Sequence, residues 1–441
     1  MAESIIGPAL IAILLAGLAP QAPAAEDNAA KEPPRFKLTF TERIRQETQD
    51  NVTSLSQAAA DGGSYLRFRT SLMGQWRIGG GFSLTVRLTN ENRYYLIPKT
   101  DPKNGRDYNP GEVFFDYLHL QWKSAFGLPL TLTVGRQDLM LGEGLVVWDG
   151  GPLDGSRSAY FNAVRGDWAW SRNAVLTAFY CYQPPFDEFL PLINDARQKM
   201  VEQGERGVGL YFTGAFGNTG LEAYLIRKNA RASGLLPESA LTTAGARTIL
   251  PYSSRLSLTA EGAVQSGRFG VLDRTGFAAT FHMDFQTAAA APLPAVLTLG
   301  GLFLSGDDPS TPGRYEGWDP VFARWPKWSE SLIYVLGRET GKPAYWSNIA
   351  SIYGALSFTL AENLKLEATL HTLGAAQAEG PSALLSGTGR DRGRLLNVKL
   401  TYDVNKNLSG HFWADYFRPG DFYFAGAHGY LWVRFELMFQ Y

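Results

Sequence analysis

The chain ends in the stretch Gly429–Tyr441, GYLWVRFELMFQY, in which apolar and polar side chains alternate. One face would carry Leu431, Val433, Phe435, Leu437, Phe439 and Tyr441. The other face would carry Tyr430, Trp432, Arg434, Glu436, Met438 and Gln440. Alternation with a period of two indicates a β-strand that has one apolar face.

The same alternation recurs along the chain, most clearly in residues 82–89, 130–134, 255–265, 364–370 and 396–402. From this pattern we predict 18 strands, an even number, as in single-chain bacterial outer-membrane barrels. The predicted strands are 36–47, 64–76, 82–94, 112–123, 129–137, 156–166, 173–183, 205–215, 218–228, 242–250, 255–266, 274–286, 295–305, 345–360, 364–373, 390–403, 408–418 and 429–441.

The connections between these strands alternate between short and long. Short turns are expected at 77–81, 124–127, 216–219, 251–254, 361–363 and 405–407. Long connections are expected at 48–63, 95–111, 138–155, 184–204, 229–241, 307–344, 374–389 and 419–428, with one short outer connection from Gly267 to Asp273. Short turns on one side and long loops on the other are typical of an all-β, antiparallel, up-and-down transmembrane β-barrel of the outer-membrane type. The alternating final strand with its terminal aromatic residue resembles the assembly signal of such barrels.

The composition excludes several other classes of protein. The 441 residues are 45% hydrophobic, 13% aromatic and only 19% charged, with 47 glycines and a net charge of −1. This balance excludes a disordered charged tail and gives no overall basic field for nucleic acid. The lone Cys181 excludes a disulfide framework and a cysteine-based zinc site. After the N-terminal segment no apolar run approaches the length of a membrane helix, which leaves a large soluble β-protein or an outer-membrane barrel.

The N-terminus favours export. Residues 5–19 form an apolar segment, and Ala22-Pro23-Ala24 follows as a small-x-small cleavage pattern. We therefore predict a signal peptide at 1–25, a short periplasmic segment at 26–35 and the barrel at 36–441. The alternative is an N-terminal membrane anchor, because the leading residues MAES contain no basic side chain.

If the apolar positions face lipid, the opposite positions line the lumen. Basic residues on that face are concentrated in the first three strands: Lys37, Arg43, Arg45, Arg67, Arg69, Arg87 and Arg93. Later strands add Arg255, Lys365, Lys399 and Arg434, while acids on the same faces are Glu47, Glu91, Glu261, Glu367, Asp403 and Glu436. Fixed guanidinium groups in a low-dielectric tube focus positive potential and pair with carboxylates. The lumen is therefore predicted to carry an anionic, carboxylated solute, and the alternative is that Arg–Glu pairs only brace the wall.

Several motifs resemble those of the alginate export porin family of bacterial outer membranes. They are Val134-Gly-Arg-Gln137, Leu141-Gly-Glu-Gly144, Trp148-Asp149, Asp154-Gly-Ser-Arg157, Gln265-Ser-Gly267, Ser305-Gly-Asp-Asp308, Trp318-Asp-Pro-Val-Phe322 and Arg418-Pro-Gly-Asp-Phe422. The resemblance covers residues 36–441 and implies an 18-stranded monomeric barrel that passes an anionic polyuronate outward through an arginine-lined constriction. Carried over onto the matching positions, it adds Arg136, Asp154, Arg157, Arg247 and Asp307 to the pore-lining candidates.

One departure from the family pattern concerns the channel gate. Well-known family members carry a long periplasmic turn that plugs the lumen before the penultimate strand, whereas here that turn is only Asn405-Lys-Asn407. Any gate would therefore have to come from outer loops such as 307–344. The partners expected from the resemblance are an anionic polysaccharide or small anionic solute, the bilayer and lipopolysaccharide, the outer-membrane assembly machinery and periplasmic secretion partners. Nucleic acid and cofactors are not expected.

The alternatives to polysaccharide export are a passive porin, an enzyme and an adhesive barrel. A passive anion-selective porin for small carboxylates or oligosaccharides shares the fold and the basic lumen. An enzyme is disfavoured, because the five histidines form no metal-binding pair and no nucleophile elbow or phosphate-binding loop is present. A purely adhesive barrel is disfavoured because 18 strands enclose a lumen wide enough for solute.

Overall fold

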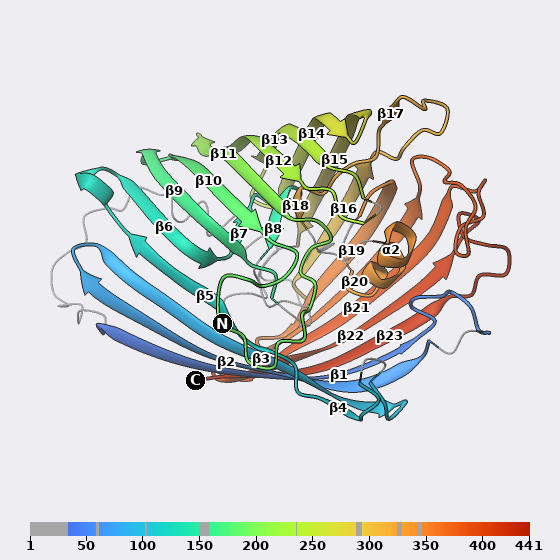
Figure 1. Ribbon diagram of the computed structural model, residues 1–441, viewed down its shortest axis with the longest axis horizontal. Helices are drawn as coiled ribbons and strands as arrows, with labels where there is room; N and C mark the ends of the chain where they lie inside the picture. The colour runs from blue at the N-terminus through green and yellow to red at the C-terminus, as the bar shows by residue number, and fades with distance from the viewer. Residues whose placement is uncertain are drawn as a thin grey trace.

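The computed structural model describes residues 34–58, 61–101, 104–149, 158–234, 236–287, 293–323, 329–341 and 346–441. Within these ranges, 18 antiparallel strands close into a single barrel (Figure 1). The barrel strands are β1 (Phe36–Asp50), β2 (Gly63–Gly79), β3 (Phe82–Ile97), β5 (Val113–Trp122), β6 (Leu130–Gln137), β9 (Phe161–Ser171), β10 (Ala174–Gln183), β11 (Glu205–Phe216), β12 (Thr219–Ala230), β13 (Ser239–Pro251), β14 (Leu256–Phe269), β15 (Leu272–Gln286), β16 (Ala295–Leu304), β19 (Ile349–Ala361), β20 (Leu364–Gly374), β21 (Asp391–Asn405), β22 (Leu408–Pro419) and β23 (Tyr430–Gln440). Closure is made by β1, which pairs with both β2 and β23, so the barrel sheet has no open edge at this seam.

The predicted fold class, strand number and strand order are confirmed. The predicted strand 345–360 begins later, at Ile349, because Asn348 just before it has a left-handed backbone with φ of 54° and its side chain is bonded into a loop. The connections separate as predicted into a short-turn end, which includes 405–408, and a long-loop end, which includes 305–348. Between β14 and β15 the long-loop end carries a tight turn in which Gly270 has φ of 60°.

The alternation of side chains along the strands is also confirmed. In β23, Leu431 and Phe435 are 50% and 44% exposed on the outer surface of the barrel, whereas Trp432 and Arg434 are almost completely buried inside. This arrangement matches a barrel whose outer surface contacts lipid, since apolar side chains there would otherwise face water.

Exposed and half-buried aromatic side chains gather at the short-turn end. Phe36 packs on Trp76 with ring centroids 4.8 Å apart, Phe82 stacks on Trp122 at 4.9 Å, and Trp168 stacks on Trp170 at 5.4 Å. These rings lie near the ends of β1, β2, β3, β5 and β9, as expected for the aromatic girdle of a membrane barrel.

The described parts of two long connections fold into the barrel. Residues 138–149 contribute β7 (Leu139–Leu141) and β8 (Val147–Asp149). Residues 305–323 contribute β18 (Phe322–Ala323), which pairs with β8 to complete a small three-stranded sheet. Loop 305–348 also carries β17 (Arg314–Tyr315) and α2 (Leu332–Thr340), and a short strand β4 (Tyr108–Asn109) and a 3-10 turn η1 (Ala125–Gly127) complete the elements.

An apolar core joins these internal loops to the wall. Trp318, Phe322 and Leu145 belong to the same buried cluster as Phe161 and Ile226, which point inward from β9 and β12. The inward positions of these strands are therefore apolar where they support the loops, a departure from the simple rule that the lumen face is polar.

The predicted signal peptide 1–25 and nearly all of the segment 26–35 lie outside the described residues. In the part of the chain that is described, no helix combines the length and the apolar character needed to traverse a membrane.

Candidate functional site

Seven of the predicted residues gather on one wall of the barrel, which we call the arginine cluster. The cluster consists of Arg43, Arg45, Arg67, Arg69, Arg87, Arg93 and Arg434. The strand register brings them together: Arg43 lies opposite Arg69, Arg45 lies opposite Arg67, and Arg67 lies opposite Arg93. Like charges directly opposite one another destabilise a sheet unless counter-charges intervene.

Glu47 is the first such counter-charge. It is completely buried and accepts hydrogen bonds from Arg67 Nη1 at 2.8 Å, Arg434 Nε at 3.0 Å and the Tyr65 hydroxyl at 2.6 Å. Glu330, which reaches into the barrel from loop 305–348, forms a second ion pair with Arg434. This part of the wall and the internal loop are therefore joined through one guanidinium group.

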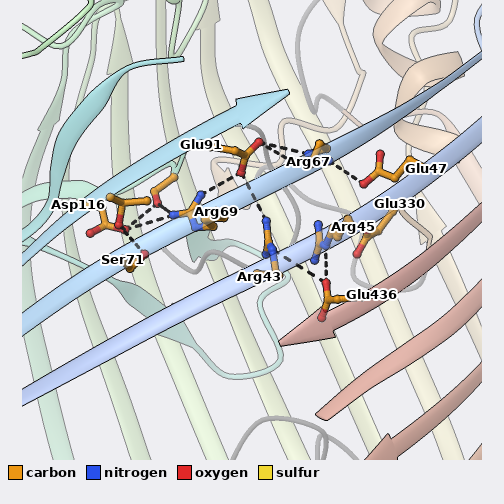
Figure 2. Close-up of polar contacts among 12 residues, drawn as sticks. Arg43, Arg45, Glu47, Arg67, Arg69, Ser71, Glu91, Asp116, Glu330 and Glu436 are labelled. Carbon is orange, nitrogen blue, oxygen red and sulfur yellow. Dashed lines mark hydrogen bonds and ion pairs between the residues drawn. The ribbon is translucent and has the colours of Figure 1, made fainter. Parts of the chain in front are cut away.

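Glu91 is the second centre of the network. Its carboxylate contacts Arg67 at 2.9 Å, Arg69 at 3.2 Å and Arg43 at 3.4 Å (Figure 2). Glu436 pairs with Arg45 on the neighbouring strand and lies 4.0 Å from Arg43.

Asp116 is the third centre. It lies 3.2 Å from Arg69 and 2.7 Å from Arg87, and it also accepts a hydrogen bond from Thr89 at 2.9 Å. Ser158, just before β9, accepts a hydrogen bond from Arg69 and donates one to Asp116. Hydrogen bonds between ions are stronger than neutral ones, so this chain of contacts holds the guanidinium planes in fixed orientations.

The cluster keeps an excess of positive charge. Its seven guanidinium groups meet five carboxylates: Glu47, Glu91, Asp116, Glu330 and Glu436. Arg93 is half-buried over the ring of Tyr65 at 5.2 Å, and no described carboxylate lies within ion-pair distance of it. Among the described residues, Arg69 Nε and Arg87 Nη2 also lack a hydrogen-bond partner. These two nitrogen atoms are buried in the wall.

The remaining predicted residues lie outside the cluster. Arg136 forms a bidentate pair with Asp187 at 2.7 and 2.9 Å and lies over Tyr160. Arg247 pairs with Glu222 at 2.6 Å on the wall formed by β12 and β13.

Lys399 and Asp307 are also separate. Lys399 Nζ lies 4.8 Å from the centre of the Trp413 ring, which Arg434 approaches at 6.0 Å, so Lys399 adjoins the cluster through an aromatic side chain. Asp307 accepts a hydrogen bond from the Glu316 backbone at 2.9 Å in loop 305–348, where burial and neighbouring carboxylates raise its pKa. Asp154 and Arg157 lie outside the described residues.

Four carboxylates of these networks were missed in the sequence: Asp116, Asp187, Glu222 and Glu330. Asp116 interrupts the apolar strand VFFDYLHLQW on the same face as Phe114, and this interruption could have identified it. Glu330 and Asp187 lie in long connections, where strand alternation gives no information about side-chain direction. The predicted basic wall is therefore more fully compensated than the sequence indicated, in agreement with a bracing role for most of its arginines.

Contacts of α2 and of the residue before it also anchor loop 305–348 to the barrel. Ser331 donates to Asp415 of β22 at 2.6 Å. In α2, Glu339 pairs with Arg392 at 2.7 Å and accepts a hydrogen bond from Tyr423 at 2.8 Å. Burial raises the pKa of Glu339 against the opposing effect of the guanidinium group, and burial likewise raises the pKa of Tyr423. The internal position of this loop agrees with the expectation that any gate comes from the outer loops.

The described ranges contain no group of three or more His, Cys, Asp or Glu side chains arranged to hold a metal ion.

Comparisons with known proteins agree with the barrel fold. A family model described as alginate export matches residues 35–432. Among solved structures, Pseudomonas aeruginosa OccK2 (OpdF) in complex with glucuronate has a TM-score of 0.59 and 12% identity, over 92% of this chain and 97% of that chain. Pseudomonas aeruginosa OpdK with vanillate has a TM-score of 0.57 and 11% identity, over 92% of this chain and 98% of that chain. Acinetobacter baumannii OccAB4 has a TM-score of 0.59 and 10% identity, over 94% of this chain and 100% of that chain. No curated protein matches the sequence.

Proposed function

The chain belongs to the alginate export family, and on that premise we propose that it is an outer-membrane channel of a Gram-negative bacterium for anionic saccharides of the polyuronate type. The observation that carries the proposal is the arginine cluster, in which guanidinium groups outnumber carboxylates on the inner wall of the barrel. A polyuronate carries one carboxylate on each sugar, and guanidinium groups pair with carboxylates in a planar, bidentate geometry.

The mechanism we propose is exchange of carboxylates between neighbouring arginines. The internal acids hold each guanidinium in place, so its free donors are oriented before the solute arrives. Arg69, Arg87 and Arg93 provide such donors in adjacent strands. Conduction requires several weak sites in series, because a single tight site would retain the solute.

Loop 305–348 would control the width of this path. It enters the barrel, contacts Arg434 of β23 through Glu330, and contacts Asp415 of the neighbouring strand β22 through Ser331. We propose that movement of this loop opens the path for a polymer and that the long-loop end faces the cell exterior.

A passive porin for small carboxylates is the second candidate. Two observations favour it. The turn from β21 to β22 is too short to supply a periplasmic plug, and the similar barrel OccK2 was solved in complex with glucuronate, a single uronic acid.

We further propose that the barrel functions as a monomer without a cofactor. The partners that we propose are the bilayer and its lipopolysaccharide, the outer-membrane assembly machinery, and periplasmic secretion partners in the case of export.

The deciding experiment is planar-bilayer conductance of the refolded protein in a salt gradient, with uronate oligomers, glucuronate or neutral dextran added. Anion-selective current that uronate oligomers block and dextran does not would support polysaccharide export. Block by glucuronate without an effect of the oligomers would support the small-carboxylate porin. Cation-selective current would contradict both functions.

A double variant connects the current to the cluster. Arg87→Gln with Arg93→Gln removes two cations and should lower the preference for anions. The matched control is Arg165→Gln, which removes an inward-facing arginine outside the cluster. Arg165 is 28% exposed and lies 2.9 Å from its partner Asp167. An equal loss of selectivity in the control would contradict the assignment to the arginine cluster.

A further inference from the structure

The outer surface of the barrel carries a group of exposed arginines at the long-loop end of β11 to β14. Arg206 lies on β11, Arg227 on β12 and Arg268 on β14, and all three are exposed. Arg231, just after β12, and Arg314, on the neighbouring β17, are exposed as well. We call these five residues the rim patch.

The strand alternation places the three strand arginines on the lipid side of the barrel. Each follows the outward row of its own strand: Arg206 is two residues from Val208, Arg227 two from Leu225, and Arg268 four from Val264. These aliphatic side chains are 51%, 52% and 56% exposed. Side chains an even number of positions apart share a face, so the guanidinium groups lie directly beyond the apolar surface toward the long-loop end.

The register brings the arginines close together. Arg206 lies opposite Asn229, Asn229 lies opposite Ala240, and Ala240 lies opposite Arg268. Three strand spacings separate Arg206 from Arg268 by about 14 Å, and Arg227 lies about 7 Å along the strand from Asn229. The five strands β11 to β15 run side by side along this part of the barrel (Figure 1).

The rim patch is only partly neutralised by neighbouring acids. Its five guanidinium groups share the surface with two exposed carboxylates, Glu238 and Asp273. Asp273 lies opposite Arg268 in the β14–β15 pair and is in register with Arg314 of β17. Within the described residues none of the five arginines lies within ion-pair distance of a carboxylate, and Arg227 Nη1 donates to Thr242 Oγ1 at 2.9 Å. This differs from the arginine cluster inside the barrel, where most guanidinium groups contact acids.

We propose that the rim patch binds the phosphate groups of the outer-leaflet glycolipid, lipid A. The acyl chains would cover the aliphatic row below, and the phosphorylated sugars would lie over the arginines, which bind phosphate bidentately. The proposal rests on the outer-membrane location proposed above and on the outward direction of the long loops, and it does not depend on the solute carried in the lumen.

The position of the patch favours a lipid over a protein partner. Stable protein interfaces have an apolar centre surrounded by polar residues, whereas here the charge lies on one side of an apolar row. A charged row beside an apolar row matches the layered structure of a membrane interface.

The experiment measures binding of Kdo2–lipid A to the detergent-purified barrel, with dephosphorylated lipid A and inorganic phosphate as comparisons. The test variant is Arg206→Gln with Arg227→Gln and Arg268→Gln. The control variant is Arg172→Gln with Arg255→Gln and Lys406→Gln, which removes the same charge from exposed turns at the opposite end. Heat-modifiable migration in gels shows that each variant is folded.

The test variant should bind Kdo2–lipid A at least about tenfold more weakly, because the substitutions remove three charge-assisted contacts with phosphate. The control variant should bind Kdo2–lipid A as tightly as the wild type does. With dephosphorylated lipid A, the wild type, the control variant and the test variant should all bind equally. Equal binding by the test variant, or an equal loss in the control, would overturn the proposal. Competition by millimolar inorganic phosphate would identify a free-anion site instead. The ion selectivity of the test variant should equal that of the wild type. Failure of the lipid A proposal is therefore distinguishable from failure of the proposed channel function.

Discussion

Substitution of Glu47 by glutamine tests the central part of the arginine cluster. The change keeps the volume of the side chain and leaves an oxygen that can accept the Tyr65 hydrogen bond. It removes the negative charge that Arg67 and Arg434 share at 2.8 and 2.9 Å. Both arginines keep their second partners, Glu91 and Glu330.

The expected loss of stability follows from burial. Glu47 has no exposed surface, and the side chains of Arg67 and Arg434 are 3% and 2% exposed. Removal of one partner from a buried ion pair costs about 3–5 kcal/mol, since the remaining charge is left without compensation. We expect a decrease of about 3 kcal/mol in the free energy of unfolding, the lower end of that range, because the second partners remain.

The matched control is Glu367→Gln. Its partner Lys365 is 2.8 Å away, as close as in the buried pair, but the side chains are 38% and 32% exposed. Exposed ion pairs contribute about 0–1 kcal/mol, so the control should lose at most about 1 kcal/mol.

The assay is urea-induced unfolding in phospholipid vesicles, followed by tryptophan fluorescence, together with the reversal potential in a salt gradient. Glu47→Gln should be less stable and also more anion-selective, because it enlarges the excess of guanidinium groups in the lumen. Wild-type stability together with a wild-type reversal potential would refute the reasoning. Equal destabilisation by both variants would show that burial does not decide the strength of these pairs.

Three further predictions concern the loops and the wall. Glu330→Gln removes the carboxylate that joins loop 305–348 to Arg434 of the arginine cluster. Proteolysis of this loop should therefore be faster than in the wild type. An unchanged rate of proteolysis would show that this ion pair does not hold the loop. Gly207→Ala should destabilise the barrel by about 1–3 kcal/mol through overpacking, because its Cβ would lie 2.5 Å from the Phe322 ring, while Gly262→Ala, whose nearest neighbour is 4.0 Å away, should be tolerated in the same unfolding assay. Burial and neighbouring carboxylates raise the pKa of Asp307, so the folded loop binds a proton more readily than the unfolded loop and should become more protected from hydrogen exchange as the pH falls toward that pKa. Asp307→Asn should remove this pH dependence, and its persistence would contradict the assignment.

Much of the barrel could be predicted from the sequence because the environment of each strand is simple. One face contacts lipid and the other faces inward, so a period of two identifies the strands and the direction of each side chain. The predicted strands 242–250 and 274–286 correspond to β13 and β15.

The candidate site could be predicted only in part. Strand alternation identified the arginines that point inward from β1, β2, β3 and β23, and the register then brought them together. Alternation gave no information on the long loops, so it could not show that Glu330 and Asp187 would neutralise Arg434 and Arg136.

The sequence by itself therefore determined the barrel, its strand number and its basic inner wall, since these depend on local alternation and on turn lengths. Only the tertiary structure decided how that wall is compensated and that the described residues of the connections after β6 and β16 pack inside the barrel. Those features depend on contacts between residues hundreds of positions apart, such as Arg45 with Glu436 and Glu47 with Arg434. The physical reason is that closure of the barrel joins the first strand to the last, and no local pattern records which side chains meet across that seam.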